Sequence, residues 1–390
     1  MPVMAAPDRA SDSRPFFGRV ESLRGLGAML VAGYHFGGAP VNGISLMPDA
    51  PWPDAGPFQN ALRQLGATAL AAHAALMVFF IISGFVLRLS LQYGPQQPVG
   101  ATIRFLLGRV FRMYPIVVFA VILATVVAKQ PVTVREFFAH ALLIDVSING
   151  TWWALQVELI MAPIIVALYF LERSRGQRVL MFLAIVTSAL AFKPSWALWR
   201  PISVNMFAFI LGMLIPTAGR SFVAGLNRRA AGTWLAVALV LIVLPNPLCG
   251  RYSRVGAVIE GYLAFVLVSL VAYRPDLRAL RWLDVKPLRL VGQASGSYYV
   301  LHMATVPPAL AVAAAFVPAS WSAAAPVFVG MLVLSVWLIA FAPAAVGTYY
   351  LIELPGIALG KRVMRRLKIG AKPAPTAGAE PAGVGRDAPR

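Results

Sequence analysis

Two ionisable residues in the first apolar stretch of the chain have the chemistry and the spacing of a reaction site. Residues 19–36 read as a membrane-spanning helix, yet they include Glu21, Arg24 and His35. Ionisable groups in hydrocarbon are costly, so they persist mainly where function needs them or where a partner neutralises them. On a helix, Arg24 and His35 share a face to within roughly 20° and lie roughly 16 Å apart along the axis. This face would carry a fixed cation at one end and a titratable imidazole at the other.

An acidic residue occurs in a later apolar stretch, at a depth that we expect to match that of His35. Glu158 lies just beyond Trp152 and Trp153, an aromatic pair of the kind found at membrane interfaces. A carboxylate at this depth either pairs with a cation or orients and charges an imidazole. We therefore predict Glu158 as a partner of His35.

Two arginines, Arg109 and Arg112, stand at the start of another apolar stretch. Their spacing of three residues projects both side chains from the same side of a helix. Guanidinium groups match phosphate oxygens in paired geometry, which favours a phosphate clamp. The same residues also fit an ordinary cluster of basic residues that fixes the orientation of a membrane helix. The spacing leaves both interpretations open.

Polar residues in two further stretches have both structural and functional interpretations. The Ser83–Gly84 pair is more typical of close packing between buried helices than of chemistry. Ser297 and Tyr299 precede His302, so this histidine is either a structural residue satisfied by its neighbours or part of a site.

The composition indicates an all-α polytopic membrane protein. Of the 390 residues, 59% are hydrophobic and 13% are charged, whereas soluble domains carry about 25% charged residues. Residues 1–15 are polar and show no pattern of a removable signal peptide. One cysteine, Cys249, excludes an internal disulfide framework and gives no metal cluster, so we expect no metal site.

The hydropathy pattern predicts about ten transmembrane helices, with both termini in the cytoplasm. The expected spans are roughly residues 19–38, 66–91, 107–128, 152–171, 178–193, 199–216, 232–248, 255–273, 289–316 and 325–351. In this topology 26 of the 34 Lys and Arg residues lie on the inner side and seven on the outer side. The net charge of +19 is therefore explained by the positive-inside rule, and nucleic acid is not an expected partner. We expect disordered ends at 1–15 and 369–390 around a membrane domain at 16–368.

Six short motifs resemble, in order, those of the membrane-bound acyltransferase-3 family. They are Glu21 to Leu26 with His35, Phe79 to Phe85, Arg109 to Pro115, Trp153 to Glu158, Gly292 to His302, and Glu353 to Pro355. Each motif alone is weak, but six in the family's order are specific, and the likeness covers roughly residues 16–368. The family includes O-acetyltransferases of bacterial surface polysaccharides, lipopolysaccharide and Nod factors.

This resemblance implies transfer of an acyl group, first of all acetyl from acetyl-CoA, to a carbohydrate hydroxyl in a bacterial inner membrane. The expected partners are acyl-CoA, a carbohydrate or glycolipid acceptor, and membrane lipids. On this view His35 and Glu158 are catalytic, and Arg24, Arg109 and Arg112 bind the CoA phosphates. The expected supporting residues are Glu21, Ser83, Trp153, Ser297, Tyr299, His302 and Glu353.

Several alternatives remain open at the level of sequence. His35 is either a general base acting on the acceptor hydroxyl or a covalent acyl carrier. Arg24 either contacts CoA or pairs with Glu21. A flippase for a carbohydrate precursor would also use ionisable residues inside the membrane, and the acceptor could instead be a small glycoside or a secondary metabolite. The outer loop 37–65 would shape the acceptor site or simply connect two spans. The sequence does not fix the acceptor, the acyl length or the oligomeric state.

Overall fold

The computed structural model describes residues 16–38, 56–95, 97–127, 131–192, 199–250 and 253–369, and within these ranges the chain forms helices and no strand. The predicted disordered segment 1–15, nearly all of the predicted tail 369–390, and most of the predicted outer loop 37–65 lie outside the described residues.

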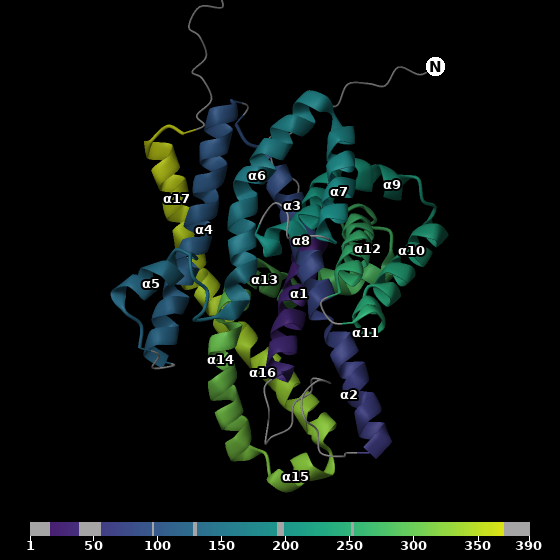
Figure 1. Cartoon of the computed structure of the whole chain (residues 1–390), viewed down its shortest axis with the longest axis vertical. Coiled ribbons are helices and arrows are strands. Elements are labelled where there is room, and N and C mark those ends of the chain that lie inside the picture. Colours follow the sequence, from purple (N-terminus) through teal and green to yellow (C-terminus); the bar gives the residue numbers. More distant parts are fainter. Residues whose placement is uncertain are drawn as a thin grey trace, which may run out of the picture.

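Seventeen α-helices follow one another through the described part of the chain (Figure 1). They are α1 (Gly18–Gly37), α2 (Gly56–Leu70), α3 (Ala72–Gln92), α4 (Pro98–Val127), α5 (Val134–Ala141), α6 (Trp153–Arg175), α7 (Gln177–Ala191), α8 (Arg200–Leu214), α9 (Arg220–Ala224), α10 (Arg228–Leu241), α11 (Pro245–Cys249), α12 (Arg254–Tyr273), α13 (Lys286–Gln293), α14 (Ser295–Phe316), α15 (Ala319–Ala324), α16 (Pro326–Thr348) and α17 (Leu354–Arg366).

Seven helical stretches of the described chain are long and apolar enough to cross a membrane, and each overlaps a predicted span. They are Gly56–Gln92, Pro98–Val126, Gly150–Arg175, Arg200–Ala224, Arg254–Tyr273, Ser295–Phe316 and Pro326–Arg366. The other three predicted spans correspond to α1, α7 and α10. Arg19, Glu21 and Arg24 make the first half of α1 polar, and α7 and α10 have only 15 and 14 residues. At 1.5 Å per residue these two helices are shorter than a hydrocarbon core of about 30 Å. The count of ten therefore remains a prediction.

Helix α1 lies among other helices and packs against α13, α3, α14 and α16. Its contact with α13 is very close, because a Cβ atom on Gly25 would lie 2.6 Å from the backbone nitrogen of Gly292. Glycine at both positions lets the two backbones touch. The first turn of α1 is also fixed by Arg19, whose guanidinium donates two hydrogen bonds to Asp284, at 2.8 and 2.9 Å. These bonds lower the pKa of Asp284 below its usual range.

Helices α3 and α8 cross through two glycines. A Cβ atom on Gly84 would lie 2.1 Å from the carbonyl oxygen of Phe209, and one on Gly212 would lie 2.1 Å from the carbonyl oxygen of Ile81. Close helix packing is therefore a role that Gly84 has in this structure. The contact also fixes the position of the neighbouring Ser83.

The last membrane helix carries a local distortion where it meets α17. After α16 the chain forms a π-helical turn, η5 (Tyr349–Glu353), before α17 begins. Pro355 removes one backbone donor at this point, and single π-helical turns often occur at functional sites. Gly356 and Gly360 pack α17 onto Phe111 and Pro115 of α4. This packing fixes the carboxylate of Glu353 beside α4.

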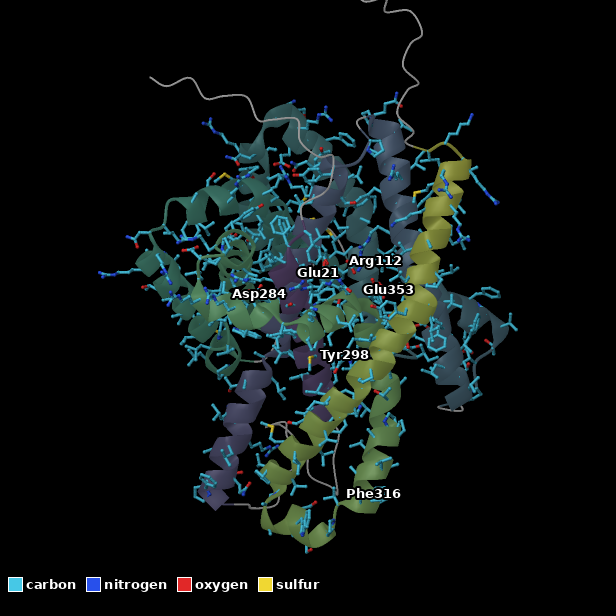
Figure 2. All side chains as sticks on the ribbon, turned by 180° about the vertical axis from the view of Figure 1, so that it is seen from behind. Glu21, Arg112, Asp284, Tyr298, Phe316 and Glu353 are labelled. Atoms are coloured by element: carbon cyan, nitrogen blue, oxygen red, sulfur yellow. The ribbon has the colours of Figure 1, made fainter. Side chains whose placement is uncertain are left out.

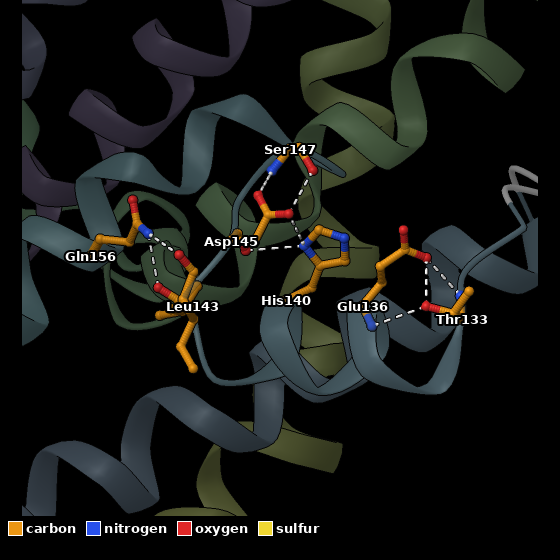
Figure 3. Close-up of polar contacts among 8 residues, drawn as sticks. Thr133, Glu136, His140, Leu143, Asp145, Ser147 and Gln156 are labelled. Atoms are coloured by element: carbon orange, nitrogen blue, oxygen red, sulfur yellow. Dashed lines mark hydrogen bonds and ion pairs between the residues drawn. The ribbon is translucent and has the colours of Figure 1, made fainter.

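Residues 132–148 contain α5 and a compact turn (Figure 3). Thr133 and Glu136 form a capping box, and the bonds from Thr133 lower the pKa of Glu136. His140 is buried and bonds through Nδ1 to the carbonyl oxygen of Asp145 at 3.0 Å. Gln156 of α6 donates to the carbonyl oxygen of Leu143 at 2.8 Å and so ties this segment to α6.

Candidate active site

A cavity of about 300 Å³ lies among α3, α4, α6, α14 and α17, and we call it the basic cavity. Its wall contains five cationic and two acidic side chains: Arg24, Arg104, Arg109, Arg112, Lys361, Glu158 and Glu353. Apolar residues of the same helices form most of the remaining wall. The excess of cations predicts an anionic ligand with an apolar portion.

Glu158 is held inside the basic cavity by two neighbours. Arg109 forms an ion pair with it at 2.5 Å, and the side chains of both residues are nearly buried, at 11% and 13% exposed. The hydroxyl of Ser83 donates a hydrogen bond to the same carboxylate at 3.1 Å. Three helices therefore meet at one carboxylate.

Glu353 is held in a similar way on the other side of the cavity. Its carboxylate accepts a hydrogen bond from Ser297 at 3.0 Å and lies 3.5 Å from Nε of Arg112. Gly296 leaves room for the carboxylate, since a Cβ atom there would lie 3.1 Å from Oε2. Figure 2 shows Arg112 of α4 and Glu353 of the turn before α17 next to each other. The π-helical turn η5 thus positions the buried carboxylate of Glu353 in the wall of the basic cavity.

Arg24 is buried where α1 meets α13. It pairs with Glu21 at 3.0 Å and donates a 2.9 Å hydrogen bond to the carbonyl oxygen of Gly292. The alternative in which Arg24 pairs with Glu21 is therefore realised in the structure. Arg24 still lines the basic cavity, within electrostatic range of Arg112 and Glu353.

Arg104 and Lys361 differ from the other cations of the basic cavity. Both are exposed, and neither has an ion pair or hydrogen bond to another described residue. Arg109 and Arg112 already hold carboxylates, whereas these two side chains have donors free for a ligand. Arg104 and Lys361 are therefore the two cavity cations most available to an incoming anion.

A second cavity, of about 420 Å³, lies among α1, α3, α8, α12 and α14, and we call it the histidine cavity. Its polar and aromatic wall residues are Tyr34, His35, His73, Trp153, Arg200, Asn205, Arg254 and Tyr299. On α3 this cavity touches residues 72–76, whereas the basic cavity touches residues 79–91. The two cavities therefore lie toward opposite ends of α3.

His302 lies beside His35 at the histidine cavity. The two imidazole rings are 5.3 Å apart between centroids, and His302 is fully buried. Nδ1 of His302 is 2.5 Å from the carbonyl oxygen of Tyr299. A carbonyl only accepts, so Nδ1 carries the proton and Nε2 carries a lone pair. Nε2 has no hydrogen-bond partner among the described residues.

Tyr299 lines both cavities and forms a wall between them. Its hydroxyl donates to the carbonyl oxygen of Thr151 at 2.5 Å, and its ring stacks on Phe79 with centroids 6.1 Å apart. The adjacent Trp152 is fastened in turn by a 3.1 Å bond from Nε1 to the carbonyl oxygen of Val300. The start of α6 and the first half of α14 therefore hold this wall in place together.

The structure corrects one predicted pairing. Glu158 was expected to orient His35, but its carboxylate binds Arg109 and Ser83 in the basic cavity, while His35 lines the histidine cavity. The prediction was wrong because the carboxylate of Glu158 is paired with Arg109 of the adjacent α4, which compensates its charge. The titratable side chain that lies beside His35 is His302.

The other predicted residues divide between the two cavities. Arg24, Ser83, Arg109, Arg112, Glu158, Glu353 and Tyr299 line the basic cavity, and His35, Trp153 and Tyr299 line the histidine cavity. Glu21, Ser297 and His302 stand behind these walls, bonded to Arg24, bonded to Glu353 and next to His35 respectively.

Comparison with protein families identifies the kind of protein to which these two cavities belong. Residues 17–340 match the acyltransferase domain of the acyltransferase-3 family. The chain belongs to the acyltransferase-3 family. No match was found among curated proteins or among solved structures. As a member of this family with seven span-length helices, the chain is a membrane acyltransferase.

The sequence motifs did not predict a site role for several residues that line the two cavities of this acyltransferase. Arg104 precedes Gly108 and Arg112 at intervals of four, and Lys361 follows Glu353 and Ile357 at the same interval. This helical spacing was visible in the sequence. Arg200, Arg254 and Asn205 gave no such signal, because Arg254 of α12 meets Arg200 and Asn205 of α8 only in the folded structure.

Proposed function

We propose that this acyltransferase moves an acetyl group from acetyl-CoA to a hydroxyl of a carbohydrate or glycolipid at a bacterial inner membrane. The observation that carries the proposal is the pair of cavities separated by Tyr299. One cavity is suited to a phosphorylated donor, and the other presents a histidine to an acceptor.

The basic cavity is the proposed donor site. CoA carries phosphates on a long uncharged arm, and charge-assisted bonds from Arg and Lys are the usual means of holding phosphate. Arg104 and Lys361 would bind the phosphates, with Arg109 and Arg112 adding positive potential from their ion pairs. The arm would follow the apolar wall toward Tyr299, which brings the thioester to the boundary with the histidine cavity.

His35 is the proposed general base at this boundary. It takes the proton of the acceptor hydroxyl, the hydroxyl oxygen attacks the thioester carbonyl, and CoA leaves as the thiolate, which then takes up a proton. The lone pair on Nε2 of His302 is available to an N–H group of His35 and would fix its tautomer, the task first assigned to Glu158. In the alternative route, His35 first takes the acetyl group itself and then passes it on.

Acetyl transfer by purified protein tests this proposal. With acetyl-CoA labelled in the acetyl group, we expect label on a glycan acceptor and a loss of at least about 100-fold in His35→Ala, because general base catalysis is typically worth that much. His140→Gln, which changes a histidine that lines neither cavity, should retain transfer per folded molecule.

The same experiment separates the alternatives. Full transfer by folded His35→Ala would overturn the assignment of His35. Movement of glycan across a membrane without any label on it would instead indicate a transporter. Label on His35 in the absence of acceptor would select the covalent route.

A further inference from the structure

The histidine cavity carries an excess of positive charge that the reaction itself does not require. Among the described residues its wall includes Arg200 and Arg254, at the first positions of α8 and α12, and no carboxylate. In the predicted topology these are two of only seven basic residues on the outer side. Two arginines from different helices that face one cavity make it a local site for an anion.

The nearest acid on these elements is already occupied. Glu260, one and a half turns into α12, is 2% exposed and contacts Nδ1 of His73. Arg254 donates one hydrogen bond, at 2.5 Å, to the carbonyl oxygen of Phe192. That bond fixes the guanidinium without neutralising it. Among the described residues no carboxylate pairs with either Arg200 or Arg254, so their charges remain for a ligand.

The rest of the wall suits a hydroxylated ring. Trp153 and Tyr34 present aromatic side chains of the kind on which sugar rings stack. Asn205 is 3% exposed, and its Nδ2 donates to the carbonyl oxygen of Pro201 at 2.7 Å. Its Oδ1 has no partner among the described residues, which leaves a buried acceptor for a ligand hydroxyl.

We infer that the acceptor is an acidic carbohydrate, whose carboxylate or phosphate is bound by Arg200 and Arg254 while one of its hydroxyls faces His35. This inference rests on the proposed function for the hydroxyl and deepens it by naming the charge class of the substrate. Two guanidinium groups bind either kind of anion through charge-assisted hydrogen bonds. The ligand would therefore be selected by charge at one end of the cavity and modified at the other.

A matched set of oligosaccharides tests the inference, first by binding and then by acetyl transfer. The set contains a uronic acid oligosaccharide, its carboxyl-reduced form and a phosphorylated neutral oligosaccharide. We expect the uronic acid or the phosphorylated form to bind purified protein at least about tenfold more tightly than the reduced form, which corresponds to one charge-assisted bond. Added salt should weaken this preference. The tighter of the two anions identifies the acidic group.

Variants locate the effect in the cavity. Arg200→Gln, and Arg200→Gln with Arg254→Gln, should each weaken binding of the acidic glycan and raise its KM, while the KM for acetyl-CoA stays unchanged. The Arg200 side chain makes no hydrogen bond or ion pair to another described residue, so Arg200→Gln keeps the test valid if the double variant fails to fold. The control Arg135→Gln removes an exposed arginine of α5 that lines neither cavity and should change neither constant.

The outcomes separate this inference from the proposed function. Equal binding and equal acetylation of the acidic and reduced glycans would overturn the inference and leave acyl transfer intact. Salt-sensitive binding of the acidic glycan that depends on Arg200, without any acetyl transfer, would overturn the proposed function and keep the anion site. An unchanged preference in both arginine variants would also contradict the inference.

Discussion

At the scale of single residues, the structure pairs each acid of the basic cavity with an arginine and a serine hydroxyl. Glu158 has Arg109 and Ser83, and Glu353 has Arg112 and Ser297. Removing one member of a buried ion pair leaves an uncompensated charge, which is more costly than the pair is stabilising. Arg109 and Arg112 are thus first of all structural partners of these two acids, and in the proposed function they would add to phosphate binding through the positive potential of the whole cluster.

Replacing Arg109 should therefore destabilise the protein much more than replacing Arg104 on the same helix. Arg109→Met leaves Glu158 buried and unpaired, for which we expect a loss of about 3–5 kcal/mol. Arg104→Met changes an exposed side chain and should stay within about 0.5 kcal/mol. Thermal unfolding in detergent micelles measures both, and equal stabilities would contradict the structural role of the pair.

Arg104 and Lys361 should instead act on the donor. Arg104→Gln with Lys361→Gln removes the free cations of the basic cavity and should raise the KM for acetyl-CoA about tenfold, the value of one charge-assisted bond. Arg362→Gln, in the same turn of α17 but outside the cavity, is the control. An unchanged KM in the double variant would remove these residues from the donor site.

The residue scale also shows what the sequence can and cannot predict. The separation of Arg24 from His35 along one helix follows from helical periodicity, and α1 has the predicted extent. The partner of Glu158 depends on how α4 and α6 pack, which no local pattern encodes. The predicted depth of Glu158 pointed to His35, while the actual distance of 2.5 Å to Arg109 is a tertiary fact.

At the scale of helices, close backbone contacts and short-range caps determine how the cavity walls are held. The crossing of α3 with α8 brings Gly84 and Gly212 against backbone oxygens, and α1 meets α13 through Gly25 and Gly292. Motif reasoning anticipated a packing role for Gly84, because a Ser-Gly pair in a buried helix has that meaning. It could not anticipate the partner helix.

Adding one methyl group at the crossing of α3 and α8 should therefore be disruptive. Gly212→Ala places a Cβ atom against the carbonyl oxygen of Ile81, and overpacking of this kind costs about 1–3 kcal/mol or more. Gly232→Ala in α10 meets no atom within 4 Å and should be neutral or stabilising. Unfolding temperatures of the two variants provide the comparison, and a stable Gly212→Ala protein would contradict the close crossing.

The capping box of α5 should make this helix sensitive to acid. The lowered pKa of Glu136 means that its carboxylate stabilises the folded cap above its unfolded pKa, and this stabilisation is lost as the pH falls through the folded pKa. Hydrogen exchange of the α5 amides, corrected for the intrinsic pH dependence, should therefore show fraying at acidic pH. Glu136→Gln cannot titrate and should abolish this difference, whereas an unaltered pH response in the variant would exclude Glu136 as its source.

At the scale of the whole molecule, the basic cavity and the histidine cavity would serve the proposed donor and the proposed acceptor separately. The basic cavity is lined by the end of α3, the first half of α4 and α17, and the histidine cavity by the start of α3 and the first residues of α8 and α12. The all-helical class and the order of helices were predictable from hydropathy, because apolar runs must form helices inside a membrane. The division into two cavities was not, because it depends on Tyr299 lying between helices distant in sequence.

Substitutions of Tyr299 can show whether the wall between the two cavities couples the use of acetyl-CoA to acetylation of the glycan. Tyr299→Phe removes the bond to Thr151 but keeps the ring, so the wall should hold and transfer should fall only a few fold. Tyr299→Ala removes the wall, and we expect acetyl-CoA consumption to continue as hydrolysis without matching glycan acetylation. The ratio of released CoA to acetylated glycan measures this, and a ratio of one in Tyr299→Ala would show that the wall does not control water.

The sidedness of the reaction in proteoliposomes tests most directly whether donor and acceptor reach His35 from separate cavities. Protein inserted in one orientation is supplied with labelled acetyl-CoA on the side of the basic cavity and with glycan on the side of the histidine cavity. We predict labelled glycan in this arrangement, none when the two substrates exchange sides, and none with His35→Ala. Labelling that occurs only when acetyl-CoA and glycan share one side would contradict two entrances that meet at Tyr299 and His35.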